Sequence, residues 1–392
     1  MSYSSRKKTL LSFFAGCFLF ITVAQAQYDN EGLKEVIPID SSDVGWLKFR
    51  LSNENFLKNN EYFNPLMVGQ TYFGVMLHSS LTWNPNRYMR LQAGVFLRDD
   101  FGNNTIFEVI PTFTLKLQKN GYAFLFGTIE GTVNHNFIQP LYDFERYMSD
   151  HIENGVQFTA KKKFLEGDLY LSWEHHQYAG IPHDREILNT GATVSPVLFN
   201  KNKWKISVPL QAIIVHHGGQ LDTFDLPHDE SLFDDAAGIR LSYFPGTSAL
   251  ITEIRMEDYY VYYQDLGHHY FNQLFLAGHG VYANLLLKSK YHVDALLSYW
   301  YSHDFISGHG GYLYQSVSQR DPAYTEPFRK LMFFSLMYEK ELFPGLTIVA
   351  RFEGDYNFFR VHNTQFEYSY SFYMVYRPEF RLVKMKKDAV LN

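Results

Sequence analysis

The stretch LTIVARFEGDYNF, residues 346–358, decides the fold class, because polar and apolar residues alternate along it. Its apolar face consists of Leu346, Ile348, Ala350, Phe352, Tyr356 and Phe358. Its other face consists of Thr347, Val349, Arg351, Glu353, Asp355 and Asn357. Successive side chains of a β-strand point to opposite faces, whereas a helix would repeat its apolar residues about every 3.6 positions. Residues 366–377 and 88–98 alternate in the same way, so the pattern predicts long β-strands.

Three features distinguish a membrane barrel from a soluble β-sandwich, which would also show alternation. The alternating segments are about 10–14 residues long, as tilted membrane-spanning strands are. Their apolar faces often end in aromatic rings, such as Trp83 and Tyr376, as an interfacial girdle requires. Tight turns such as 84–87 alternate with long connections such as 136–154. Together these features predict a transmembrane barrel.

We expect an all-β fold: a closed antiparallel transmembrane β-barrel of about 16 strands (14–18), with short periplasmic turns and long extracellular loops. The barrel must close, because lipid offers no hydrogen-bond partner to the N–H and C=O groups of an open edge. Three of the expected strands cover residues 121–135, 203–216 and 365–380. The connections at 136–154 and 220–235 are candidates to fold into the barrel and narrow it.

The first 26 residues have the three parts of a secretory signal peptide. A basic start at Arg6–Lys8 precedes an apolar run from Thr9 to Val23, and Ala24 and Ala26 form a cleavage site. A lipoprotein signal ending at Cys17 is the weaker alternative, because apolar residues continue well past it. Cys17 is the only cysteine, so cleavage after Ala26 would leave a chain without thiols. Thiol catalysis and cysteine-based metal sites are therefore excluded.

The composition fits a barrel whose outer face meets lipid. The chain of 392 residues is 46% apolar and 18% aromatic but only 19% charged, with a net charge of −6. Ordinary soluble domains contain about 25% charged residues. Disorder is excluded, because disordered segments have few aromatic residues and a high net charge. The acidic balance argues against a nucleic-acid partner.

With these features the chain resembles bacterial outer-membrane β-barrel proteins of the porin-like kind. The resemblance rests on the hairpin alternation, the girdle rings and an aromatic-rich last strand that ends near Phe380. The cleavage site Ala24–Gln27 is similar to export sites of Bacteroidota. We expect four parts along the chain: a signal peptide at 1–26, a periplasmic N-terminal segment at 27–45, the transmembrane barrel at 46–380 and a periplasmic C-terminal tail at 381–392.

The resemblance implies an outer-membrane location and, as the leading hypothesis, a passive diffusion channel for small polar solutes. The partners it implies are membrane lipid and lipopolysaccharide, the barrel-assembly machinery and the solutes, without nucleic acid; an oligomer is left open. One alternative is an outer-membrane enzyme acting on lipid, of the phospholipase or lipid A deacylase type. Another is a non-conducting surface or assembly barrel. The width of a 16-stranded barrel favours the channel over the enzyme, because its lumen would hold water.

The channel hypothesis predicts a charged inner face. The residues expected to line the lumen are Arg90, Arg98, Glu108, Glu130, Glu174, Arg240, Glu253, Arg255, Glu257, Arg351, Glu353 and Asp355. Positive and negative side chains alternate among them, whereas an ion-selective pore would carry one sign. We therefore interpret them mainly as ion pairs that hold the wall rigid, with a selectivity filter as the alternative.

We expect no cofactor, with a divalent cation at the extracellular loops as the alternative. The weak candidates for its ligands are Asp222, Asp225, Asp229 and Glu230. Carboxylates bind hard cations such as Ca²⁺. These residues lack the spacing of a known calcium loop, so a solvated acidic loop is the favoured interpretation.

The weak catalytic candidates are two serine–histidine pairs, His78 with Ser80 and Ser302 with His303. Outer-membrane lipases and lipid A deacylases place a serine and a histidine on the lipid face of the barrel near the outer leaflet. His78 and Ser80 share a face, but the alternation points both of them inward. At the outer rim, His303 points outward and Ser302 does not, because neighbours on a strand face opposite ways. The sequence therefore favours a channel over an enzyme.

Overall fold

The computed structural model describes residues 28–178, 185–218, 229–267, 273–321, 323–359 and 366–385. The expected signal peptide with Ala24 and Ala26, and the loop residues Asp222 and Asp225, lie outside the described residues. None of the described helices has the length and apolar character that crossing a bilayer requires.

The described chain consists almost entirely of strands. Its first part contains η1 (Ser41–Asp43), β1 (Trp46–Glu61), β2 (Thr71–Asn86), β3 (Met89–Asp100), β4 (Glu108–Lys119), β5 (Tyr122–Thr128), η2 (Thr132–His135), α2 (Arg146–Ser149), β6 (Asn154–Lys162), β7 (Leu165–His175) and β8 (Glu186–Lys201). Its second part contains β9 (Trp204–Ser207), β10 (Leu210–Gly218), β11 (Glu230–Tyr243), β12 (Ile251–Asp265), β13 (Ala277–Ser289), β14 (Val293–His303), η3 (Tyr312–Tyr314), β15 (Phe328–Phe343), β16 (Leu346–Asn357), β17 (Phe366–Tyr376) and β18 (Glu379–Lys384).

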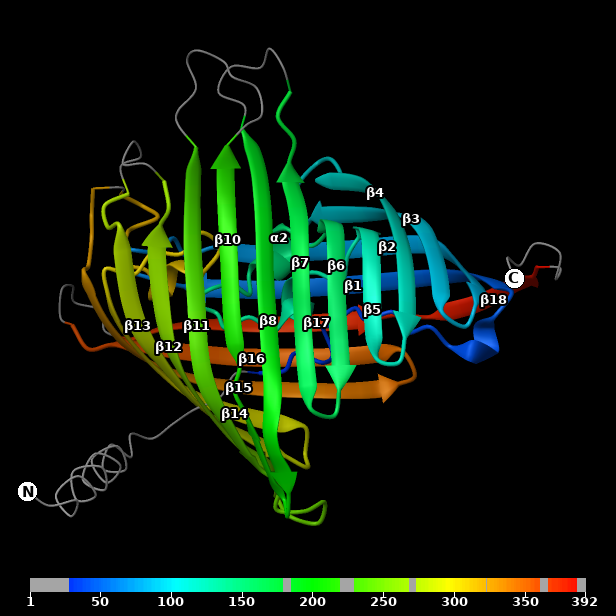
Figure 1. Ribbon diagram of the computed structural model, residues 1–392. Helices are drawn as coiled ribbons and strands as arrows, with labels where there is room; N and C mark the ends of the chain where they lie inside the picture. The colour runs from blue at the N-terminus through cyan, green and yellow to red at the C-terminus, as the bar shows by residue number, and fades with distance from the viewer. Residues whose placement is uncertain are drawn as a thin grey trace, which may run out of the picture.

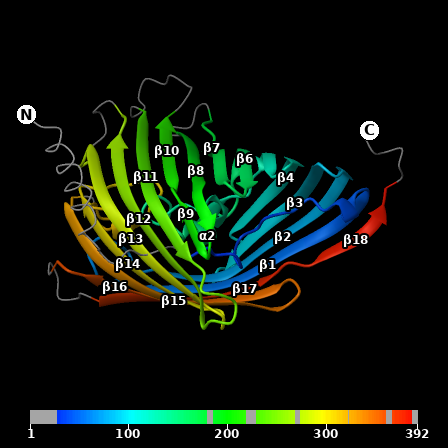
Figure 2. The same cartoon turned by 60° about the horizontal axis from the view of Figure 1, so that its bottom comes forward.

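The strands form one closed antiparallel barrel (Figures 1 and 2). Strand β1 closes the ring by pairing with β2 on one side and with β17 and β18 on the other. The 18 strand segments in the described residues make 16 crossings, because β9–β10 and β17–β18 are each one interrupted strand. The interruptions fall at Pro209 and Pro378, which have no N–H group to donate to the sheet. The predicted closed 16-stranded barrel is confirmed.

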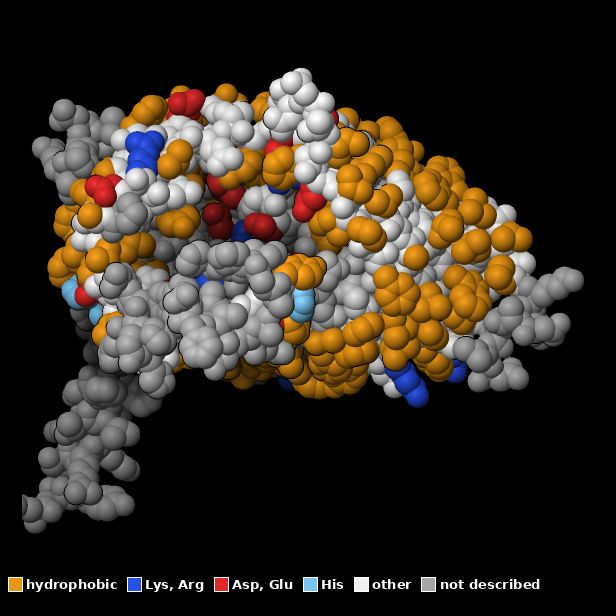
Figure 3. Space-filling model, turned by 90° about the horizontal axis from the view of Figure 1, so that it is seen from above, with side chains coloured by type: hydrophobic (Ala, Val, Ile, Leu, Met, Phe, Trp, Pro, Cys, Tyr) orange, Lys and Arg blue, Asp and Glu red, His pale blue; other side chains and the backbone are white. Residues whose placement is uncertain are grey.

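Apolar and aromatic side chains cover the outer wall. In β17, Tyr370 and Phe372 are each 45% exposed, whereas Ser371 between them is 6% exposed and points inward. Seen from above, hydrophobic side chains cover the wall and charged side chains gather in the central hollow (Figure 3). A barrel with such a wall is built to lie in lipid. The predicted location in the outer membrane is confirmed.

The connection between β5 and β6 folds into the barrel, as the sequence analysis expected of this connection. Strand β5 ends at Thr128, so the expected strand 121–135 is too long. Gly127 adopts a φ of +94° just before the chain leaves the wall, and residues 129–153 then bury apolar side chains inside the barrel. Leu141, for example, is 0% exposed and packs in a cluster with inner-wall residues.

Two further segments lie in the lumen. Residues 28–43, which the sequence analysis placed in a periplasmic segment, contact the inner wall, where Leu33 is 1% exposed. The β14–β15 connection buries Phe305 completely in the same cluster as Leu141. At the other end of the chain, β18 runs to Lys384, so the last strand extends past residue 380 into the expected tail.

Candidate functional site

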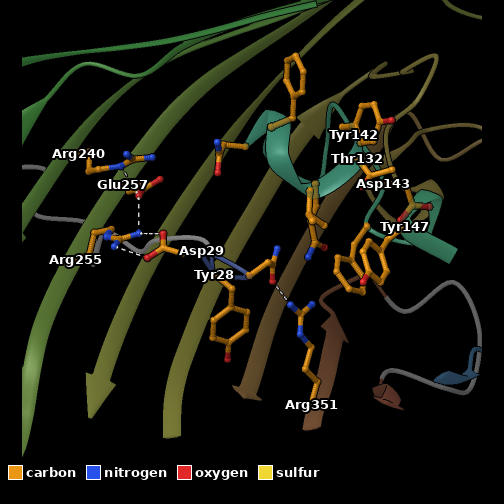
Figure 4. A pocket seen from close by; sticks show the side chains of 16 residues that line it. Tyr28, Asp29, Thr132, Tyr142, Asp143, Tyr147, Arg240, Arg255, Glu257 and Arg351 are labelled. Atoms are coloured by element: carbon orange, nitrogen blue, oxygen red, sulfur yellow. Dashed lines mark hydrogen bonds and ion pairs between the residues drawn. The ribbon is translucent and has the colours of Figure 1, made fainter. Parts of the chain in front are cut away.

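All residues that the sequence analysis placed in the lumen lie inside the barrel. On the inner face of the strands are Arg90, Arg98, Glu108, Glu174, Arg240, Glu253, Arg255, Glu257, Arg351, Glu353 and Asp355, and Glu130 lies on the inserted β5–β6 loop. Many of them form ion pairs (Figure 4). Arg255 Nε lies 2.7 Å from Glu253 Oε1, and Arg240 Nε lies 2.5 Å from Glu257 Oε1. Opposite charges therefore compensate one another along this wall.

The centre of the barrel is occupied by the inserted segments. A cavity of about 640 Å³ is lined by residues near the periplasmic turns, among them Lys161, Glu166 and Lys205. Around the inserted segments, three cavities hold only about 50, 40 and 60 Å³. The first of these lies between the N-terminal segment and the β5–β6 loop (Figure 4). The lumen is thus largely filled with protein.

A buried histidine fixes the β5–β6 loop to the wall. His135 is 0% exposed, and its Nδ1 lies 2.6 Å from Asp168 Oδ2 while its Nε2 lies 3.1 Å from Glu153 Oε2. Burial opposes the charged ring, but the two carboxylates raise the pKa of His135 to about 10. Burial likewise opposes the charged form of Glu153, yet His135 helps to lower the pKa of this carboxyl to about 2. Both groups are charged at neutral pH and hold the loop in place.

The structure does not bring the predicted catalytic pairs together. His78 and Ser80 lie on the inner face, 7% and 3% exposed. His78 Nε2 makes its hydrogen bond with Thr112 Oγ1, at 2.9 Å, rather than with Ser80. Ser302 is 0% exposed on the inner face, whereas the side chain of His303 points outward and is 38% exposed. Neither pair presents both a hydroxyl and an imidazole to lipid.

A different serine and histidine meet on the outer wall. Ser231, at the start of β11, is the direct cross-strand partner of His216, near the end of β10. Nδ1 of His216 lies 2.8 Å from Oγ of Ser231, within hydrogen-bond distance. Both residues occupy outward-facing positions, since Val215 and Leu232 beside them are buried on the inner side. Among the described residues, this is the one hydrogen bond between a serine hydroxyl and a histidine ring.

A carboxylate lies beside this pair. A β-carbon on Gly218 would sit 2.4 Å from Nε2 of His216 and 3.0 Å from Oδ1 of Asp229, so both groups border this point, although no ion pair joins them among the described residues. The imidazole therefore has a hydroxyl at Nδ1 and a carboxylate near Nε2. A serine hydroxyl in contact with an imidazole offers a nucleophile with its general base.

The three groups lie at the outer ends of β10 and β11. Directly below them toward the membrane, Ile214 and Phe233 form the next outward cross-strand pair. Above them, the connection between β10 and β11 begins. Leu266, 46% exposed, flanks Ser231 and donates its backbone N–H to the carbonyl oxygen of Ser231 at 2.8 Å.

The predicted metal ligands that the structure describes do not form a site together. Glu230 is the first residue of β11 and points inward, where its Oε1 accepts a hydrogen bond from Gln273 Nε2 at 2.5 Å. Asp229 precedes it on the opposite side and is exposed. Because neighbouring residues of a strand face opposite ways, the two carboxylates cannot share one ion.

One other group in the described residues has the composition of a metal site. Glu35, Glu54 and His151 each offer a ligand atom within 4.8 Å of the others, inside the barrel. Two arginines already pair with its carboxylates. Arg377 Nη2 lies 2.6 Å from Glu54 Oε1, and Arg50 Nη2 lies 3.3 Å from Glu35 Oε1. With both carboxylates compensated in this way, we assign no metal here.

A closed barrel with an apolar outer wall defines an outer-membrane β-barrel protein. A family model described as lipid A 3'-O-deacylase-type matches residues 39–385, and the chain belongs to this family. No curated protein matches the sequence.

Solved structures of outer-membrane proteins are similar at a remote level. OprD from Pseudomonas aeruginosa shares 10% identity, over 88% of this chain and 98% of that chain, with a TM-score of 0.44. OmpT from Vibrio cholerae shares 9% identity, over 85% of this chain and 99% of that chain, with a TM-score of 0.46. OpdK from P. aeruginosa shares 9% identity, over 86% of this chain and 100% of that chain, and its TM-score is also 0.46. No functional argument follows from matches this remote.

The family corrects the leading hypothesis of the sequence analysis. The prediction of a passive diffusion channel is wrong, because the family model that covers nearly the whole chain is of deacylase type. The error came from treating barrel width as a sign of an open lumen. Inserted segments occupy the centre of the lumen, and mixed charges of its wall form ion pairs.

Proposed function

We propose that the protein hydrolyses an ester-linked acyl chain of lipid A in the outer leaflet, at the 3′ position named in the family description. Ser231 is the nucleophile and His216 the general base. One observation carries the assignment of these residues: the 2.8 Å contact between Ser231 Oγ and His216 Nδ1 on the lipid-facing wall at its outer rim. The family membership supplies the substrate class.

The position of the pair suits this substrate. Lipid A carries its sugars and phosphates above its acyl esters and its acyl chains below them. Ser231 likewise has the polar connection with Asp229 above it and the apolar pair of Ile214 and Phe233 below it. An acyl chain lying along Ile214 and Phe233 would bring its ester to the height of Ser231.

The reaction follows from the two side chains. Ser231 Oγ attacks the ester carbonyl carbon while its proton passes to His216. The bond from that carbon to the sugar oxygen then breaks, and His216 gives the proton to the departing sugar oxygen. The acyl group is now an ester of Ser231. A water molecule gives a proton to His216 and attacks this ester, and the fatty acid leaves as the serine hydroxyl is restored.

The inner face holds a group of similar composition, which the closed wall separates from lipid. Thr112 Oγ1 lies 2.9 Å from His78 Nε2, and Glu35 Oε1 lies 3.8 Å from His78 Nδ1. All three are covered by the wall and the N-terminal segment. An acyl ester in the membrane cannot reach them, so we assign them a structural role.

The test is hydrolysis of lipid A in mixed micelles by the purified protein, followed by mass spectrometry of the released fatty acid. Ser231→Ala and His216→Ala should each lower the rate by at least about 10²-fold, since both remove a reacting group. Thr112→Ala and Ser80→Ala are the matched controls and should retain the wild-type rate. Full activity in folded Ser231→Ala would overturn the assignment of the nucleophile. Absence of acyl release by folded wild-type protein would overturn the proposed activity.

A further inference from the structure

Strand β1 carries polar side chains on the face that should meet lipid. Outward-facing positions alternate with the buried Ser52, Glu54, Phe56 and Lys58. From residue 53 to 61, the outward residues are Asn53, Asn55, Leu57, Asn59 and Glu61. Most of this face is therefore polar, and we call Asn53 and Asn55 together with Asn59 and Glu61 the β1 polar ladder.

The outer part of the ladder finds partners near the rim. Asn59 Nδ2 donates to Glu61 Oε1 at 2.7 Å, and Thr71 Oγ1 of β2 donates to Asn59 Oδ1 at 2.5 Å. Asn59 also contacts the hydroxyl of Tyr370 at 3.3 Å. These groups lie at the extracellular end of β1, where headgroups and water can complete their hydrogen bonding.

The inner part lies near the middle of β1. Asn55 Nδ2 donates to Asn53 Oδ1 at 2.8 Å. Within the described residues, this bond leaves the amide N–H groups of Asn53 and the amide oxygen of Asn55 without a side-chain partner. The flanking strands offer Asn55 no partner, because its cross-strand neighbours are Val75 and Met374. Asn53 lies opposite Leu77 and Tyr376, and among the described residues the Tyr376 hydroxyl makes no hydrogen bond to it. An amide facing hydrocarbon without a partner costs several kcal/mol.

We infer that the β1 polar ladder is the contact between two copies of this chain in the outer membrane. Primary amides carry both a donor and an acceptor, so the ladder is its own complement, as a twofold interface requires. A twofold axis along the membrane normal sets Asn53 and Asn55 of both copies at the same depth. Each copy would then supply the hydrogen-bond partners that lipid cannot. The inference is independent of the proposed deacylase activity.

The residues around the ladder suit such an interface. The cross-strand neighbours of Asn53 and Asn55 are mostly apolar: Val75 and Leu77 from β2, and Met374 and the ring of Tyr376 from β17. Met374 is 38% and Tyr376 37% exposed. An apolar frame around paired amides excludes lipid and strengthens the hydrogen bonds inside it.

The chain is well suited to a cross-linking test, because Cys17 is its only cysteine. In a Cys17→Ser background, Asn53→Cys or Asn55→Cys in intact outer membranes should form a covalent dimer on oxidation with copper phenanthroline. Phe113→Cys, an outward position on β4 that is 47% exposed, is the matched control and should remain monomeric. Equal cross-linking at all three positions would indicate random collision and overturn the inference, as would a cross-link only to another protein.

A second measurement does not depend on introduced cysteines. Asn53→Leu with Asn55→Leu should convert a dimer in mild detergent to a monomer, as measured by native mass spectrometry or analytical ultracentrifugation. The double leucine variant keeps an apolar surface that lipid tolerates, so the barrel should fold. A wild-type protein that is monomeric in both detergent and the membrane would overturn the proposal.

Discussion

His216 and Ser231 are direct partners in the antiparallel register of β10 and β11, and this register places the imidazole against the hydroxyl. A slip of one residue would set His217, which points inward, opposite Ser231 and separate the two groups. The register is secure because β10 and β11 are also paired with their other neighbours in the closed barrel. The geometry of the proposed catalytic pair is thus fixed by the wall.

Gly218→Ala should disturb this geometry without breaking the barrel. The added methyl would sit 2.4 Å from His216 Nε2 and 3.0 Å from Asp229 Oδ1, so the imidazole must turn away. Misplacement of a reacting group by about 1 Å can cost about 10²-fold in rate, and we expect kcat for lipid A hydrolysis to fall by about that factor. Gly167→Ala is the control, because its methyl would have 3.6 Å to the nearest atom. An unchanged kcat in Gly218→Ala would contradict the placement of His216 at the reacting centre.

Asp229→Asn distinguishes an orienting acid from a metal ligand. If Asp229 orients and stabilises the charged ring of His216, the amide should lower kcat by about 10²-fold or more while KM changes little. Chelation by EDTA should leave the rate of the wild-type protein unchanged, because Asp229 and Glu230 face opposite sides of the wall. Loss of activity with EDTA and its recovery on adding Ca²⁺ would show instead that Asp229 holds an ion.

The barrel could be predicted from the sequence because lipid imposes a simple pattern on it. Residues such as Tyr370 and Phe372 must be apolar while Ser371 between them is free to be polar, and the period of two is visible without any knowledge of contacts. The insertion of residues 129–153 was partly predictable from the length of that connection. Its starting point was not, because the apolar residues after Thr128 continue the alternation.

The proposed catalytic pair could not be found in this way. His216 and Ser231 are separated by a long connection, and only the register of β10 and β11 makes them neighbours. Sequence reasoning looked for serine and histidine close together in the chain and so selected Ser80 and Ser302. The useful signal was an outward-facing serine and an outward-facing histidine at the outer ends of consecutive strands.

The β5–β6 loop should depend on pH through His135 and Glu153. The pKa of His135 is raised from 6.5 to about 10, so its contribution to loop stability is complete below about 6.5 and is lost as pH rises toward 10. The pKa of Glu153 is lowered from 4.5 to about 2, so its contribution is complete above about 4.5 and is lost as pH falls toward 2. Hydrogen exchange of residues 129–153 should therefore be slowest between pH 4.5 and 6.5, after correction for the intrinsic exchange rate. In His135→Asn this dependence should disappear, and a flat wild-type profile would contradict the charged network.

Asp29 anchors the N-terminal segment, and its loss should free that segment without affecting catalysis. Its Oδ1 lies 2.5 Å from Arg255 Nη1, and its other carboxylate oxygen contacts Lys288. Burial opposes ionisation, but Arg255 and Lys288 hold the pKa of Asp29 well below its usual range. Asp29→Asn replaces the carboxylate between Arg255 and Lys288 with a neutral amide, at a cost of about 1–3 kcal/mol, so residues 28–43 should become more sensitive to added protease. Glu31→Gln is the matched control, because Glu31 is exposed and pairs with Lys34 alone among the described residues.

Hydrolysis of lipid A should be unchanged in both variants, since Ser231 lies on the other side of the wall. Equal protease sensitivity of the two variants would show that the segment is held by its apolar contacts rather than by Asp29.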